Sequence, residues 1–139
     1  MFRKILHAND GSEHAFHALT LAIRLAKESN AELHMICVEE VDYIPEFIEE
    51  IREETGTAAR RFHTVLQRAR SMAEEQRVHL KTHVIAGHAV RDILKVADDL
   101  KADLLVIGGT GHSQIYERMV GTTTARVVHL ATCPVLVVK

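Results

Sequence analysis

Residues 103–124 read DLLVIGGTGHSQIYERMVGTTT, an apolar run that ends in a cluster of glycines and is followed by a further glycine and three threonines. The run at 104–107 has the length and composition of a buried parallel strand, and the residues from 121 onward indicate the start of a helix. Glycines after a strand let backbone N–H groups approach a ligand. A helix N-terminus adds unpaired N–H donors at the positive end of its dipole. The stretch therefore predicts a phosphate-binding turn, although glycine clusters also occur in plain loops.

Two common phosphate-binding motifs do not fit this stretch. A P-loop requires Gly-Lys followed by Ser or Thr, and no lysine lies between Gly108 and Gly121. The dinucleotide fingerprint requires a third glycine where Gln114 stands, and it follows the first strand of its sheet. What remains is the spacing Gly108-x2-Gly111-x9-Gly121-Thr122.

The rest of the chain alternates between short apolar runs and segments with helical periodicity. Strands are expected at 5–8, 33–38, 79–86 and 134–138, in addition to 104–107. Helices are expected from 13, around 90–97 and at 122–130, and the charged section 42–77 is expected to be mostly helical surface. This order predicts an α/β fold with helices on both faces of a parallel sheet. With no linker or repeat in its 139 residues, the chain is expected to form a single domain.

With a strand before it and a helix after it, the spaced glycine motif resembles the ATP-binding motif of the universal stress protein family, G-2x-G-9x-G-[S/T]. The similarity extends over essentially the whole chain, through Lys4-Ile5-Leu6 and Asp10-x-Ser12 in front and 133–138 (CPVLVV) behind. The resemblance implies a doubly wound, five-stranded parallel sheet of order 3-2-1-4-5, of the adenine nucleotide alpha hydrolase-like type. A nucleotide would bind where the strand order reverses.

The resemblance also implies roles for individual residues. Asp10 would hydrogen-bond ribose hydroxyls or metal-bound phosphates, with Ala8 and Asn9 on the same wall. Val38 would offer its backbone N–H and C=O to the adenine edge, and Ile107 would lie beneath the nucleotide. The phosphates would be held by Gly108, Gly111, Gly121, Thr122 and Thr123. The ligand expected is ATP, with or without Mg²⁺, and no catalytic residue or protein metal site is implied.

Four of the candidate residues also have an alternative interpretation. Asp10 could cap the helix that begins at Glu13, since Asp10-x-x-Glu13 resembles a capping box. Val38 taken alone is a core residue, and Thr122 taken alone is a helix cap. His112 either lies beside the phosphates, where it would sense pH or charge, or is an exposed loop residue.

Composition and charge exclude several classes of partner. A formal charge of −2 gives no electrostatic reason to expect nucleic acid or an anionic membrane. No apolar run reaches the length of a membrane span, and the first ten residues lack the apolar core of a signal peptide. Cys37 and Cys133 are therefore expected to be reduced thiols in a cytoplasmic protein. The ten histidines include spaced pairs, 14 with 17 and 79 with 83, but no zinc-type cluster is visible, so we expect solvated or capping histidines.

The sequence favours nucleotide binding over catalysis. Phosphoryl transfer needs charge neutralisation and an oriented nucleophile, and Glu117 and Arg118 are the nearby candidates for these tasks. The first hypothesis is therefore an ATP-binding regulatory protein of the stress response, with slow hydrolysis or none. The alternatives are a slow ATPase or phosphotransferase in which Asp10 holds magnesium, and a dimeric scaffold that has lost its nucleotide.

The last strand, 134–138, predicts self-association. It is apolar, and the resemblance places it at the edge of the sheet, where pairing with a second copy would cover it. A homodimer is therefore expected; the alternative is a strand covered by helices. The sequence does not identify a downstream protein partner.

Overall fold

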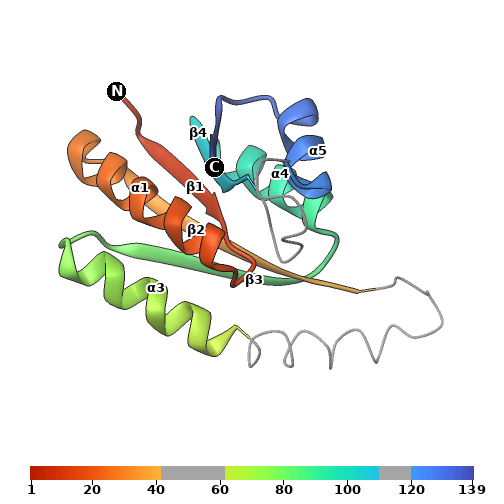
Figure 1. Cartoon of the computed structure of the whole chain (residues 1–139). Coiled ribbons are helices and arrows are strands. Elements are labelled where there is room, and N and C mark those ends of the chain that lie inside the picture. The colour runs from red at the N-terminus through yellow and green to blue at the C-terminus, as the bar shows by residue number, and fades with distance from the viewer. Residues whose placement is uncertain (42–61, 110–119) are drawn as a thin grey trace.

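The computed structural model describes residues 1–41, 62–109 and 120–139, and these form a parallel sheet with helices on both faces (Figure 1). In chain order the elements are β1 (Lys4–Ala8), α1 (Glu13–Ser29), β2 (Glu32–Glu40), α3 (His63–Glu75), β3 (Leu80–Gly87), α4 (Ala89–Leu100), β4 (Leu104–Gly108), α5 (Thr122–Leu130) and β5 (Val135–Val138). The five strands are ordered β3-β2-β1-β4-β5, and all neighbours pair in parallel. The fold class and the strand order expected from the resemblance are confirmed.

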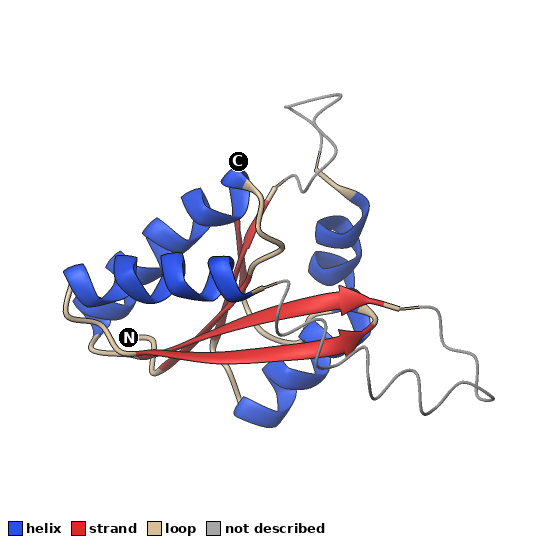
Figure 2. Cartoon of the chain, turned by 90° about the horizontal axis from the view of Figure 1, so that it is seen from below, coloured by secondary structure: helices blue, strands red, loops and turns tan. Residues whose placement is uncertain are grey.

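The two faces of the sheet pack against different helix layers, as Figure 2 shows from below. Successive side chains of a strand point to opposite faces, and the core divides accordingly. On one face, Ile5, Leu33 and Val106 join residues of α1 and α3 in one apolar cluster. On the other, Leu6, Ile36 and Leu105 join residues of α4 and α5 in a second cluster. All six of these side chains are at most 1% exposed, so the central strands are buried on both faces, as parallel strands require.

The strand register opens the sheet at its carboxyl end. Ala8, the last residue of β1, pairs with Ile36 on β2 and with Ile107 on β4. β2 continues beyond this point and stays paired with β3 as far as Glu40 opposite Gly87. The central strand β1 therefore ends before its neighbours β2 and β4 do, and a recess forms between the ends of β2 and β4 where β1 stops.

Asp10 does not cap the N-terminus of α1. The N-cap residue is Ser12, whose Oγ accepts a hydrogen bond from the Ala15 N–H at 3.2 Å. The Asp10 Oδ1 accepts instead from the Ser12 N–H at 3.0 Å. The capping-box interpretation of Asp10 and Glu13 is thus wrong, because Ser12 stands closer to the first turn and takes the cap position itself. Asp10 stabilises the preceding turn.

The structure also describes both cysteines and part of the charged section 42–77. Cys37 and Cys133 are both free thiols, the first in the core and the second partly buried. Of the section 42–77, the structure describes 62–77, which contains α3 as expected, while 42–61 lies outside the described residues. Among the described residues, no helix combines the length and apolar character that a membrane crossing requires.

Candidate functional site

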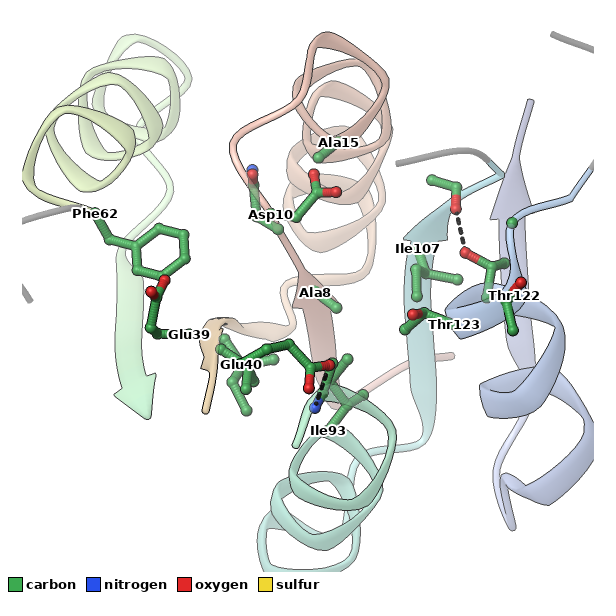
Figure 3. Close-up of a pocket in the computed structure, with 17 residues that line it drawn as sticks. Ala8, Asp10, Ala15, Glu39, Glu40, Phe62, Ile93, Ile107, Thr122 and Thr123 are labelled. Carbon is green, nitrogen blue, oxygen red and sulfur yellow. Dashed lines mark hydrogen bonds between the residues drawn. The ribbon is translucent and has the colours of Figure 1, made fainter. Parts of the chain in front are cut away.

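A cleft of about 510 Å³ lies at the carboxyl ends of β1, β2 and β4, in the recess left where β1 stops (Figure 3). This is the point at which the strand order reverses, and ligands of open α/β sheets bind at such points. Its volume falls within the range of small-molecule sites. The lining residues come from β1 and the following turn, β2, β4, and the N-terminal ends of α1, α4 and α5, together with Phe62 just before α3.

Nine of the eleven residues predicted from the sequence line this one cleft. They are Ala8, Asn9, Asp10, Val38, Ile107, Gly108, Gly121, Thr122 and Thr123. The structure thus brings together segments separated by more than a hundred positions in the chain. The other two, Gly111 and His112, lie outside the described residues, as do Glu117 and Arg118.

The glycine turn and the start of α5 are tied together by short hydrogen bonds. The Gly121 N–H donates to the Gly109 carbonyl at 2.7 Å, and the Thr124 hydroxyl donates to the Gly108 carbonyl at 2.8 Å. The Gly109 N–H in turn donates to the Val138 carbonyl of β5 at 2.8 Å. These bonds fix the first turn of α5 against the end of β4.

Gly108 has a packing reason to be glycine. A Cβ at this position would lie 3.2 Å from the backbone oxygen of His14 in α1, closer than ordinary van der Waals contact. Gly11 is the described glycine with a positive φ, at 87°. Gly108 therefore serves close backbone approach and not a left-handed turn.

The first residues of α5 line the cleft with amides that have no partner within the helix. The helix begins at Thr122 after Gly121, which acts as N-cap without a side chain. The first intrahelical N–H is that of Ala125, which donates to the Gly121 carbonyl at 2.9 Å. The N–H groups of Thr122 and Thr123 thus have no helical partner, and they stand at the positive end of the helix dipole. This end of the cleft is suited to an anion.

The turn after β1 forms the opposite wall. The Asn9 N–H donates to the Ile36 carbonyl at 2.9 Å, which anchors the turn to β2. The Asn9 Oδ1 accepts from the Gly11 N–H at 2.8 Å, and Asp10 between them lines the cleft. Figure 3 shows Asp10 on the same side as Ala15, across the cleft from Glu40 and Ile93.

The backbone of Val38 points into the recess. In a strand, residues two apart direct their N–H and C=O groups to the same side. The Ile36 carbonyl accepts from Asn9, so Val38 turns its own N–H and C=O toward the space beyond the end of β1. The Val38 side chain packs against the apolar cluster on the α4 and α5 face. The core interpretation of the Val38 side chain is therefore compatible with a ligand role for its backbone.

Eight further lining residues were not predicted: Ala15, Ile36, Glu39, Glu40, Phe62, Ala89, Ile93 and Thr124. Glu40 joins β2 to α4, because its Oε1 accepts from the Ala89 N–H at 3.0 Å. Glu39 and Glu40 follow Val38 directly, so their place on the same strand end was available from the sequence. Phe62, Ala89 and Ile93 come from other elements, and no motif marks them.

The charge of the described lining is acidic. Asp10, Glu39 and Glu40 contribute carboxylates, and the lining residues that the structure describes include no lysine or arginine. Backbone amides are therefore the anion-binding groups of the described cleft. The carboxylates are ligands of the kind that hard divalent cations take, and they also accept hydrogen bonds from hydroxyl groups.

Two buried titratable groups lie behind the Asp10 wall. Burial lowers the pKa of His7 to about 4, although hydrogen bonds to backbone carbonyls and the charge of Asp10 oppose this shift. Burial raises the pKa of the Cys37 thiol to about 12, and the charge of Asp10 adds to the effect. At neutral pH both side chains are uncharged.

The spaced histidines do not assemble into a metal site in the described parts of the chain. His83 contacts His34 of β2 and not His79, with 2.9 Å between the His34 Nδ1 and the His83 Nε2. Within residues 1–41, 62–109 and 120–139, no group of three or more His, Cys, Asp or Glu residues is arranged to hold a metal ion.

The chain is similar to known proteins along its whole length. A model of the universal stress protein family matches residues 1–139. Universal stress protein YxiE of Bacillus subtilis is 36% identical over 151 residues, and the match covers 100% of both chains. Among solved structures, MJ0577 of Methanocaldococcus jannaschii has a TM-score of 0.87 at 25% identity and covers 100% of this chain and 96% of its own.

Two solved structures that share the fold contain adenine nucleotides. A universal stress protein in complex with cAMP has a TM-score of 0.77 at 22% identity, covering 99% of this chain and 97% of its own. A universal stress protein of Archaeoglobus fulgidus in complex with dAMP has a TM-score of 0.63 at 20% identity, covering 100% and 98%. At these identities the likeness establishes the fold.

Proposed function

The chain belongs to the universal stress protein family, and we propose that its cleft binds an adenine nucleotide, ATP in particular, as a regulatory ligand. The observation that carries the proposal is the junction of the glycine turn with α5. There, Thr122 and Thr123, whose N–H groups have no partner within the helix, line a cleft at the reversal point of the sheet. Adenine nucleotides in two structures of the same fold support this choice of ligand class.

The two walls of the cleft offer complementary chemistry to the two ends of a nucleotide. The backbone N–H and C=O of Val38 form a donor and acceptor pair that matches the edge of adenine, and Ile107 offers an apolar surface beneath the base or sugar. Asp10 accepts hydrogen bonds from ribose hydroxyls, with Ala8 and Asn9 beside it. Gly108, Gly121, Thr122 and Thr123 hold the phosphates, and Gly111 and His112, outside the described residues, belong to the same proposal.

Magnesium fits the charge of the site. The described lining supplies three carboxylates and no cationic side chain, so a bound triphosphate needs a counter-charge. Asp10 is the lining carboxylate on the wall opposite the phosphate-binding end of the cleft, where the ribose lies in this proposal. Mg²⁺ is typically held by one or two carboxylates together with substrate phosphates, and the site offers that donor set.

The site favours binding over rapid hydrolysis. Phosphoryl transfer needs charge neutralisation and an oriented nucleophile, and the described lining contains no lysine or arginine, while Glu117 and Arg118 lie outside the described residues. The protein therefore hydrolyses ATP slowly or not at all and acts through the conformation or partner choice that the nucleotide sets. A slow Mg-ATPase or phosphotransferase is the alternative, and single-turnover hydrolysis within seconds in the presence of Mg²⁺ would establish it.

The central test is nucleotide affinity in wild type and Gly121→Val. Gly121 has a φ of −63°, which valine tolerates, so the substitution adds bulk at the phosphate end without straining the backbone. Calorimetric titration with ATP, ADP, AMP and cAMP is expected to give binding in wild type and at least a tenfold loss in the variant. Ala131→Val places the same side chain at the other end of α5 and serves as control. Wild-type protein that binds none of these nucleotides at millimolar concentration contradicts the proposal, and leaves the dimeric scaffold as the remaining hypothesis.

We further propose a cytoplasmic homodimer that pairs through the C-terminal strand region 134–138. β5 (Val135–Val138) lies at one edge of the sheet with β4 as its described neighbour. Its four residues are partly exposed in the single chain, so a twofold partner would cover an apolar edge. Sedimentation velocity at micromolar concentration tests this, and a monomer would reject it.

A further inference from the structure

A histidine lies inside the sheet at a position where an apolar side chain would be expected. His7 in β1 is 0% exposed, and the pairing of β1 places it between Met35 of β2 and Val106 of β4. Burying a polar ring is unfavourable unless its nitrogens are hydrogen-bonded. Both nitrogens of His7 have partners, at the Val106 carbonyl and at Asn9.

These partners fix which atom donates and which accepts in each hydrogen bond that links Val106, His7, Asn9 and Gly11. The Val106 carbonyl only accepts, so the His7 Nδ1 carries the proton and donates to it at 3.0 Å. The neutral ring then has an acceptor at Nε2, which takes the Asn9 Nδ2 at 3.3 Å. Asn9 is thereby oriented with its Oδ1 toward the Gly11 N–H at 2.8 Å. The result is a buried relay from Val106 through His7 and Asn9 to Gly11.

The relay connects the two turns that form the walls of the cleft. Its first member, Val106, stands two residues before Gly108 at the end of β4. Its last bond holds Gly11, which has the positive φ of 87°, and so sets the turn that presents Asp10. The Asn9 N–H also donates to the Ile36 carbonyl, two residues before Val38. Asn9 lines the cleft but is only 3% exposed. Both ends of its side-chain amide are taken by His7 and Gly11, so the amide supports the turn.

We infer that His7 and Asn9 are positioning residues for the nucleotide, which hold the Asp10–Gly11 turn in its binding conformation through a buried hydrogen-bond relay anchored on β4. This inference rests on the proposed function. Asp10 lies between Asn9 and Gly11, which are joined by the hydrogen bond from the Gly11 N–H to the Asn9 Oδ1, so releasing that bond frees the turn without touching the phosphate end of the cleft.

The substitution Asn9→Asp tests the relay by its pH dependence. Aspartate keeps an oxygen for the Gly11 N–H but cannot donate to the His7 Nε2. The relay closes again only when His7 takes up a second proton, which the new carboxylate favours. The charged group already facing His7 is Asp10, and the backbone carbonyls of Val106 and Ala15 face it from β4 and α1. The variant therefore needs the doubly protonated His7 ring to close the relay, whereas wild type closes it with the neutral ring.

The measurement is calorimetric affinity for ATP and for AMP at pH 6 and pH 8, expressed as the ratio of variant to wild type so that titration of the nucleotide cancels. We expect Asn9→Asp to bind about tenfold more weakly than wild type at pH 8, the effect of one broken hydrogen bond, and to recover most of the loss at pH 6. Asn9→Ala is expected to lose about tenfold at both pH values. The control Asn30→Asp makes the same chemical change at the C-cap of α1 and is expected to leave both ratios near one.

An Asn9→Asp ratio that is equal at the two pH values overturns the inference, as does wild-type affinity in folded Asn9→Ala. If wild type binds neither ATP nor AMP, the proposed function fails, and the Gly11 amide resonance decides the relay separately. That resonance is expected to titrate between pH 6 and pH 8 in Asn9→Asp and to stay fixed in wild type. A Gly11 resonance that does not titrate in the variant rejects the relay whatever the ligand.

Discussion

We expect acid to destabilise this protein in part through one buried side chain, His7. The buried His7 has a pKa of about 4 in the folded chain, against 6.5 for an ordinary histidine. Above pH 6.5 the ring is neutral in both folded and unfolded chains, and its titration has no effect on stability. As the pH falls below 6.5, the unfolded chain takes up a proton that the folded chain cannot, and the free energy of unfolding decreases until about pH 4.

The size of this effect follows from the two pKa values. At 1.36 kcal/mol per pKa unit, the difference corresponds to a loss of about 3 kcal/mol once the pH is below 4. Between pH 7.5 and pH 5 the same relation gives about 2 kcal/mol. Stabilities of 5–15 kcal/mol are typical of such domains, so this loss is readily measured by urea unfolding.

The assay compares how much stability each variant loses between pH 7.5 and pH 5. His7→Asn keeps a side-chain donor for the Val106 carbonyl but no longer titrates. It is expected to start from a lower stability, since the Asn9 amide loses its partner, and to lose about 2 kcal/mol less than wild type across the interval. His17→Asn, at an exposed position of α1, is expected to follow wild type. His34 and His83, whose pKa values are also lowered by burial, contribute equally to all three proteins. Equal losses in His7→Asn and wild type would refute the reasoning.

Two further substitutions probe the ends of the strands that frame the cleft. Thr124→Val removes the hydroxyl that donates to the Gly108 carbonyl. It is expected to lower the free energy of unfolding in urea by about 1–3 kcal/mol and to weaken ATP binding. The control Thr132→Val loses an exposed hydroxyl contact and is expected to change neither quantity. Gly87→Ala places a methyl group far inside van der Waals contact with the Asp92 carboxylate. The carboxylate must then move away, and it loses the hydrogen bond that it accepts from the His88 N–H at 2.9 Å. We expect Gly87→Ala to lower the free energy of unfolding by about 1–3 kcal/mol, and this loss should largely disappear when Asp92 is also replaced by alanine. Additive losses in that double-mutant cycle would show that the clash is not the cause.

The fold was predictable because its signals are local and agree with one another. Apolar runs and helical segments alternate regularly, which predicts the α/β class, whereas the strand order and its reversal point were implied by the resemblance to the family. The boundaries were less predictable where charge conceals a strand. β2 was expected to end at Val38 because Glu39 and Glu40 are charged, yet it runs to Glu40, since β3 continues to supply backbone partners there.

The site was predictable where it lies within a motif and not where it depends on distant packing. Gly108, Gly121, Thr122 and Thr123 could be named from the motif, and they line the cleft, while Gly111 lies outside the described residues. Asp10 was considered from the sequence as the cap of α1, and only the geometry of the turn shows that Ser12 takes that position. The role of His7 depends on the Val106 carbonyl, 99 residues away, and no local pattern contains that information.

The central placement of Cys37 has a practical consequence. Its thiol is 0% exposed and its pKa is raised to about 12, so neither contact with reagent nor the reactive thiolate is available in the native chain. Alkylation of Cys37 therefore requires the middle of the sheet to come apart. In a Cys133→Ser background, the rate of modification by a thiol reagent reports how often β2 separates from its neighbours, and slower labelling with added ligand would register occupancy of the cleft without any optical probe.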